Sequence, residues 1–271
     1  MGAPEFGNPL GNPLSRPSSA GAVASINPQT YYFKGSYTDA VSGVFEIPAG
    51  FSFARVTAIG GGGGGSGSNS NFGGGGGGLA RTSVQRVNTG EKISYSITAG
   101  SQRGTAGGNA SATFKNYSLV ATGGAAAADG TTPKPGGVGS GGDVNNNGGL
   151  GRTGGGGCAG ITGPGGDGSL SVGTTTYYSG DGGAGGAAGS AGGGGGGGLG
   201  QAGGDATYLS TNPSFSEQLS MPGPTAGTSV GVNTNGERSK GGDFGGGGGA
   251  YNGTAGQQGY GGVGGVIIEL W

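Results

Sequence analysis

The sequence has no histidine, only one cysteine, and few charged residues, with 12 basic and 13 acidic side chains in 271 residues. Without histidine there is no imidazole to act as a general base, as a member of a catalytic triad or as a metal ligand. The single cysteine, Cys158, cannot form an internal disulfide, and we interpret it as a small buried side chain. We therefore expect no catalytic site, no cofactor and no metal site.

Other features that the sequence lacks exclude further classes of function. The net charge is −1, and neither a basic cluster nor an Arg-Gly-Gly triplet occurs, so we expect no nucleic-acid binding. No apolar run reaches the roughly 18 residues of a membrane-spanning helix. Most acidic residues stand singly beside glycine, as in Asp167, Asp181, Asp205 and Asp243. This placement is typical of turns and differs from the paired carboxylates of glycan-cleaving enzymes.

Glycine dominates what is present, at 80 of 271 positions, whereas an average protein has about 7%. In several stretches it recurs at every third position, which is typical of a polyproline-II-type helix with three residues per turn. Collagen is not indicated, because each stretch is short and contains little proline. The glycines that we assign to this scaffold are Gly148, Gly151, Gly154, Gly157, Gly183, Gly186, Gly189, Gly192, Gly195, Gly198, Gly253, Gly256, Gly259 and Gly262.

A second kind of sequence lies before, between and after the glycine runs. There, β-branched and aromatic residues alternate with small polar ones, a pattern with a period of two that predicts β-strands. No segment predicts an α-helix, because glycine disfavours the helix by about 1 kcal/mol per residue. The predicted strands are Gln29–Tyr37, Val41–Ile47, Phe51–Ile59, Leu79–Val87, Lys92–Thr98, Ser111–Phe114, Tyr117–Thr122 and Val266–Trp271.

The first 28 residues show neither the glycine period of three nor the alternation typical of strands. Five prolines punctuate them, and the sequence Gly-Asn-Pro-Leu occurs twice in succession. Proline fixes φ and lacks a donor, so we expect an extended segment that builds no core. It is either a flexible leader, in part an expression remnant, or an arm that docks on a neighbouring subunit. In the second case the attachment residues are Pro9, Leu10, Pro13 and Leu14.

Two stretches together carry a family resemblance. One is the predicted strand Val56–Ile59, which runs directly into six glycines, and the other is the C-terminal stretch Gly261–Trp271. They resemble the glycine-rich domain of bacteriophage tail fibres and receptor-binding tips, of the polyglycine-II adhesin type. The resemblance implies an all-β protein in which an antiparallel, β-sandwich-like base carries a bundle of polyglycine-II helices, with essentially no α-helix.

This architecture suggests four parts. Residues 1–28 form the attachment arm, and residues 29–122 form the β-rich base, with glycine-rich inserts at 60–78 and 100–108. Residues 123–265 form the glycine-rich bundle with its display loops, and residues 266–271 form a strand that returns to the base.

Segments that interrupt the glycine period must leave the bundle and are therefore candidate display loops. They are Ser66–Phe72, Ala125–Pro135, Asp143–Asn147, Ser169–Ser179, Asp205–Lys240 and Ala250–Tyr251. Aromatic side chains are favoured at interfaces because they bring a large area at low entropy cost. Either these residues bind a receptor or they cap the apolar end of the bundle. The candidate binding residues are Thr174, Tyr177, Tyr178, Tyr208, Phe215, Met221 and Tyr251.

The function that we expect from the resemblance is host attachment by a non-enzymatic protein on the surface of a virion. The arm would join other virion proteins, and the loops would bind a bacterial surface glycan or an outer-membrane protein. Two alternatives remain open: a structural fibre or adaptor without receptor binding, and an ice-binding protein of polyglycine-II type. Fibres of this kind are commonly trimers, and the sequence leaves both a monomer and a homotrimer open.

Overall fold

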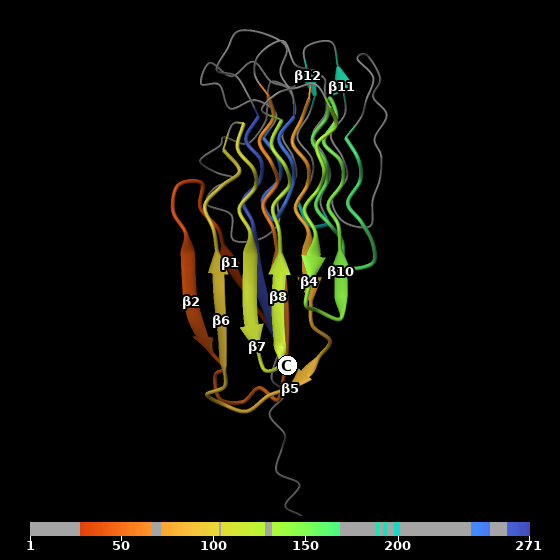
Figure 1. Ribbon diagram of the computed structural model, residues 1–271. Coiled ribbons are helices and arrows are strands. Elements are labelled where there is room, and N and C mark those ends of the chain that lie inside the picture. The colour runs from red at the N-terminus through yellow and green to blue at the C-terminus, as the bar shows by residue number, and fades with distance from the viewer. Residues whose placement is uncertain are drawn as a thin grey trace, which may run out of the picture.

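The computed structural model describes residues 28–66, 72–102, 104–127, 132–168, 198–200, 240–249 and 259–271, with the backbone alone at 188–189 and 192–193. Within these residues the secondary structure is β throughout and no helix occurs, which confirms the all-β prediction. The arm residues Pro9, Leu10, Pro13 and Leu14 lie outside the described residues. Figure 1 shows most of the strands toward one end of the molecule and mainly segments drawn without strand arrows toward the other.

Two antiparallel sheets form the base. The six-stranded sheet has the order β1-β13-β3-β4-β10, and β5 pairs with β3. The five-stranded sheet has the order β2-β6-β7-β8-β9. The strands of the first sheet are β1 (Gln29–Lys34), β3 (Phe53–Ile59), β4 (Leu79–Arg81), β5 (Gln85–Arg86), β10 (Val144–Asn146) and β13 (Gly265–Leu270); those of the second are β2 (Val41–Glu46), β6 (Lys92–Ile97), β7 (Ala110–Phe114), β8 (Tyr117–Ala121) and β9 (Gly139–Ser140). A further pair, β11 (Ala188–Gly189) and β12 (Gly192–Gly193), stands apart from both sheets.

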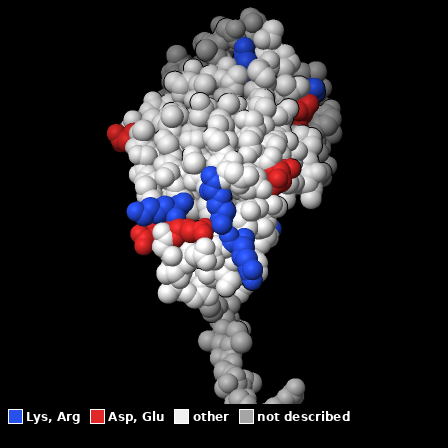
Figure 2. Space-filling model, turned by 60° about the horizontal axis from the view of Figure 1, so that its bottom comes forward, with Lys and Arg blue, Asp and Glu red and all other residues white. Residues whose placement is uncertain are grey.

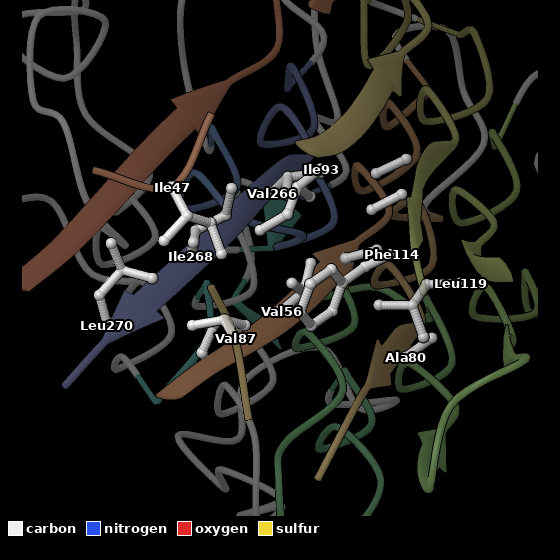
Figure 3. Packing of buried hydrophobic residues seen from close by; sticks show 14 of the residues in the cluster. Ile47, Val56, Ala80, Val87, Ile93, Phe114, Leu119, Val266, Ile268 and Leu270 are labelled. Carbon is white, nitrogen blue, oxygen red and sulfur yellow. The ribbon is translucent and has the colours of Figure 1, made fainter. Parts of the chain in front are cut away.

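The alternating strand sequences build a core between the two sheets. Ala54, Val56 and Ala58 of β3 point into it, and every second residue of β13 does the same. Phe114 of β7 is the largest fully buried side chain of the core, lying close to Val56 and Leu119 in Figure 3. Small residues on β3 face larger ones on the second sheet, so the two layers interlock. The sandwich-like base therefore follows from the period-two pattern.

A second, smaller core lies on the outer face of the six-stranded sheet. Ile59, Leu79 and Ile267 are the outward residues that contribute to it. They are covered by Cys158, Ala159 and Phe244, which belong to the glycine-rich half of the chain. Cys158 is fully buried, as predicted. The glycine-rich half is thus fixed to the sandwich by apolar contacts as well as by chain connections.

Two predictions about strands are wrong. The predicted strand Leu79–Val87 is two short strands, β4 and β5, because the Thr82 hydroxyl accepts a hydrogen bond from the Val56 N–H at 3.1 Å and displaces the regular pairing. The segment Asp143–Asn147 is not a display loop. It contains β10, which pairs with β4, and the outward Val144 packs on the second core. The strand was missed because asparagine is poor in strands.

The two ends of the sandwich differ in the chain segments that enter and leave them. At one end Gln29 pairs with Leu270, so β1 begins and β13 ends there; we call this the base end. At the other end β3, β6 and β8 run out into glycine-rich segments, and further segments return into β4, β7 and β13 (Figure 1). The residues farthest along these segments define what we call the far end.

Candidate functional site: the glycine-rich layer and its far end

Glycine-rich segments lie side by side beyond the sandwich, and together we call them the glycine-rich layer. Their backbone hydrogen bonds join them across long sequence separations. The segments are 60–65, 73–78, 105–108, 122–127, 134–137, 148–152, 154–159, 164–168, 241–249 and 259–264. The stretches 60–65 and 73–78, which we expected as inserts in the base, lie inside this layer.

Hydrogen bonds from segment 60–65 repeat every three residues. Each of the six N–H groups donates to another segment, and groups three residues apart donate to the same one. Gly60 and Gly63 donate to Gly78 and Gly75, Gly61 and Gly64 to Gly108 and Thr105, and Gly62 and Gly65 to Gly262 and Gly259, all at 2.8–3.0 Å. In a β-strand successive N–H groups would point alternately to two sides. Here they point in turn to three neighbours.

Segment 73–78 is surrounded still more completely. Its N–H groups donate with the same period of three to segments 148–152, 241–249 and 122–127. Its carbonyl groups accept hydrogen bonds from three other segments, through donors at Gly60, Gly63, Gly137, Gly156 and Ala159. Six neighbours thus bond to this one segment through the backbone alone. Buried peptide groups must be paired, and the layer satisfies this requirement without a sheet.

Steric contacts explain why these positions are glycine. A Cβ atom on Gly62 would overlap the carbonyl group of Gly246, and one on Gly74 would overlap that of Gly63. A Cβ on Gly76 would overlap the carbonyl of Gly157. At these positions glycine is required by the close approach of another backbone. Gly104 differs, because it has a φ of 59° and no atom near its Cβ position, so it serves a turn.

The predicted scaffold glycines fall into two groups. Gly148, Gly151 and Gly262 meet the carbonyls of Gly76, Gly73 and Gly242 in the way described above. Gly154, Gly157, Gly198 and Gly259 are also buried, and Gly189 pairs with Gly192 between β11 and β12. However, the register that we expected to run through 148–157 is no single segment, because the chain reverses between Arg152 and Gly154. Gly183, Gly186, Gly195, Gly253 and Gly256 lie outside the described residues.

None of the predicted receptor-binding residues can be placed. Thr174, Tyr177, Tyr178, Tyr208, Phe215, Met221 and Tyr251 all lie outside the described residues. The structure does place the residues that flank several of the predicted loops. Ser66 donates to the Phe72 carbonyl at 3.1 Å, and Gly65 donates to Gly259.

More flanking residues lie at the same end. Ala127 donates to Gly64 at 3.0 Å, and Gly64 itself donates to Thr105 at 2.9 Å. Gly241 donates to Tyr260 at 2.7 Å. The described chain therefore leaves the layer and re-enters it at the far end on either side of 67–71, 103, 128–131 and 250–258. This end lies opposite the base end.

A buried ion cluster fixes the hairpin 241–249 to the sandwich. The Asp243 carboxylate is fully buried, 2.6 Å from Nζ of Lys34 and 3.0 Å from Nζ of Lys240. Lys34 belongs to β1, and Lys240 immediately precedes the hairpin. We predicted Asp243 as a turn residue, but its carboxylate also forms ion pairs with the two lysines. The spacing Lys240-x-x-Asp243 was a visible signal for one pair, but nothing in the sequence links Asp243 to Lys34.

The described side chains offer little for catalysis. They include no group of three or more histidine, cysteine, aspartate or glutamate residues that could hold a metal ion. Burial raises the pKa of the Cys158 thiol, so it stays protonated and unreactive. On the outer sheet face Glu269 accepts hydrogen bonds from Arg55 and Arg81 at 2.7–2.9 Å. Desolvation raises the pKa of Glu269, but these arginines more than offset it and hold that pKa below its usual value.

Among the described residues, no helix is long and apolar enough to cross a membrane. No protein-family model matches the chain, and neither does any curated protein.

Proposed function

We propose that the layer is a bundle of polyglycine-II helices, and that it displays receptor-binding loops at the tip of a bacteriophage fibre. Support for the first part is the period of three in the backbone hydrogen bonds of segments 60–65 and 73–78. A left-handed helix of three residues per turn points successive peptide groups in three directions. Six neighbours around segment 73–78 is the number that such helices would have in a hexagonal array.

The observation that carries the second part is the separation of the two ends. The first and last strands meet at the base end through Gln29 and Leu270. Residues that flank the interruptions of the glycine-rich sequence, such as Ser66, Phe72 and Gly259, lie at the far end. Binding loops are commonly presented on a rigid scaffold. Here many backbone hydrogen bonds tie the scaffold together, and segments that lack the glycine period adjoin it at one end. An arm at the base end would then join the particle, and the far end would meet the host.

Adsorption to bacteria tests this function. The full chain, fluorescently labelled, is mixed with a panel of bacterial strains, and bound protein is measured against concentration. Saturable binding to a subset of strains is expected, because a receptor differs between hosts. The double substitution Tyr177→Ala with Tyr178→Ala should weaken binding about 30-fold or more if the pair is a hot spot.

The control separates folding from binding. Gly90→Asn changes a turn at the base end, where the glycine has a φ of 82° and a Cβ atom would meet nothing closer than 3.7 Å, so it should leave both thermal stability and adsorption unchanged. A structural fibre or adaptor would bind no strain in the panel while still assembling on particles. That result would replace the receptor-binding proposal.

A further inference from the structure

A cation-lined hollow lies at the base end, opposite the far end. Its volume is about 400 Å³, and its lining residues are Ser52, Arg86, Val87, Asn88 and Lys115. Arg86 is placed by β5, which pairs it with Phe53 of β3. Lys115 sits in the tight turn between β7 and β8, with a φ of 53°. Strand β5 of one sheet and the β7–β8 turn of the other thus hold the two cations in position.

Only one of the two cations that line this hollow forms an ion pair with a described carboxylate. Nζ of Lys115 lies 3.2 Å from a Glu91 carboxylate oxygen, and the Asn88 amide donates to the same carboxylate at 2.8 Å. Arg86 is exposed, and within the described part of the chain its guanidinium has no ion pair. The hollow therefore carries one matched and one unmatched cation. A further carboxylate is the group that would complete it.

Apolar side chains lie next to the unmatched cation. Phe53 is 42% exposed, and Val84, two residues before Arg86 in the chain, is 48% exposed. Phe53 and Arg86 are cross-strand partners, so they project from the same face. Figure 2 shows that charged side chains on the visible face are close together toward the base and sparse over the middle. Cations beside exposed apolar groups suit a peptide that carries both acidic and apolar side chains better than a free anion.

We propose that this hollow is the docking site for an acidic segment of another particle protein. The inference rests on the proposed function for the nature of the partner, a component of the particle. In this arrangement Arg86 pairs with a partner carboxylate, the Ser52 hydroxyl and Asn88 amide add donors, and Phe53 and Val84 contact an apolar side chain. The base end then binds the particle while the far end remains open.

The test uses the full chain and a labelled hexaglutamate peptide, with binding followed by fluorescence anisotropy at low and physiological salt. Arg86→Glu combined with Lys115→Glu should weaken binding about tenfold or more, since two exposed attractions become repulsions. Lys92→Glu reverses another cation of the same end that does not line the hollow, and it should leave the affinity within about twofold. Hexalysine should not bind, and salt should weaken the hexaglutamate complex.

Three results would overturn the proposal. They are no hexaglutamate binding by the folded wild-type chain, equal weakening by Lys92→Glu and by the double variant, and complete competition by inorganic phosphate at millimolar concentration. The third would mean that the hollow takes a free anion only. Because these measurements involve no bacteria, their failure is distinct from a failure of adsorption. A chain that adsorbs to host cells but ignores hexaglutamate keeps the proposed function and loses the docking site.

Discussion

The base and the glycine-rich layer are stabilised by different chemical groups: the base by its side chains and the layer by its backbone. In the base, side chains such as Phe114, Val56 and Ile268 fill the space between two sheets. In the layer, segments such as 60–65 and 73–78 pack backbone against backbone, with almost no side chains between them. Burial of apolar area stabilises the base, whereas the layer relies on hydrogen bonds and close contacts.

This difference has an energetic consequence. Fixing a glycine costs more conformational entropy than fixing any other residue, so an isolated glycine segment should not be ordered. In the layer the segments continue strands of the base, as 60–65 continues β3 and 259–264 leads into β13. The sandwich thus sets the spacing and direction with which these segments enter the layer. We therefore expect the layer to depend on the base for its order.

The largest expected effect is the addition of a side chain inside the layer. Gly76→Val places a Cβ on the Gly157 carbonyl and separates two backbones that are hydrogen-bonded to their neighbours. Overpacking of about 1–3 kcal/mol, with about 1–3 kcal/mol for each peptide group left unpaired, should remove most or all of the stability. Urea unfolding measures the loss. Gly104→Asn is the matched control, and a tolerated Gly76→Val would contradict close backbone packing.

Next in size is the loss of the buried charge that joins the two regions. Asp243→Asn leaves Lys34 and Lys240 without their shared carboxylate, both of them largely buried. Breaking a buried ion pair in this way typically costs about 3–5 kcal/mol. Thermal unfolding should show the decrease, while the exposed Asp39→Asn should change stability by less than about 0.5 kcal/mol. Equal effects from the two variants would mean that the cluster does not hold the hairpin.

A substitution in the core of the base should have a smaller effect. Phe114→Leu keeps an apolar side chain of similar size, so we expect a loss of about 1–2 kcal/mol. This is less than for one added side chain at Gly76, although Phe114 is the far larger residue. Phe53→Leu on the surface of the same sandwich is the control. If Phe114→Leu proved worse than Gly76→Val in urea, the contrast between the two regions would be reversed.

The smallest predicted effect concerns pH. Desolvation raises the pKa of Glu269 in the folded protein, but the hydrogen bonds from Arg55 and Arg81 outweigh it and hold this pKa below its usual value. Its stabilising contribution is therefore present above the unfolded pKa, and it is lost as the pH falls through the folded pKa. Because the group is only half-buried, we expect less than about 1 kcal/mol. Glu269→Gln should flatten the acid limb of the stability profile below about pH 4.5, and an unchanged acid limb would contradict this assignment.

The sequence predicted the base better than the layer. Alternation in stretches such as 41–47 and 92–98 gave strands that differ from β2 and β6 by a single terminal residue. The break between β4 and β5 could not be predicted, because it depends on a hydroxyl of Thr82 that bonds to Val56 of another strand. In the layer, the glycine period of three predicted a three-residue repeat, and the backbone hydrogen bonds of segment 60–65 do repeat every three residues. The glycine period could not indicate which segments are neighbours, since glycine has no side chain to specify a partner.

The candidate site shows the same limit. The interruptions of the glycine period predict that those segments leave the bundle, and Ser66 and Phe72, which bound one of them, are hydrogen-bonded to each other at the far end. The buried partner of Asp243 and the hollow around Arg86 and Lys115 were not expected. Both combine residues far apart in sequence that only the sheet order brings together.

Amide hydrogen exchange of the full chain tests the central claim, which is that the layer is ordered through its backbone in three directions. Residues Gly60–Gly65 donate six successive hydrogen bonds, so all six amides should exchange slowly, at rates comparable to those of β3 and β13. Protection at every second residue would indicate a strand at the edge of a sheet. Fast exchange at all six, with β3 and β13 still protected, would contradict the account directly.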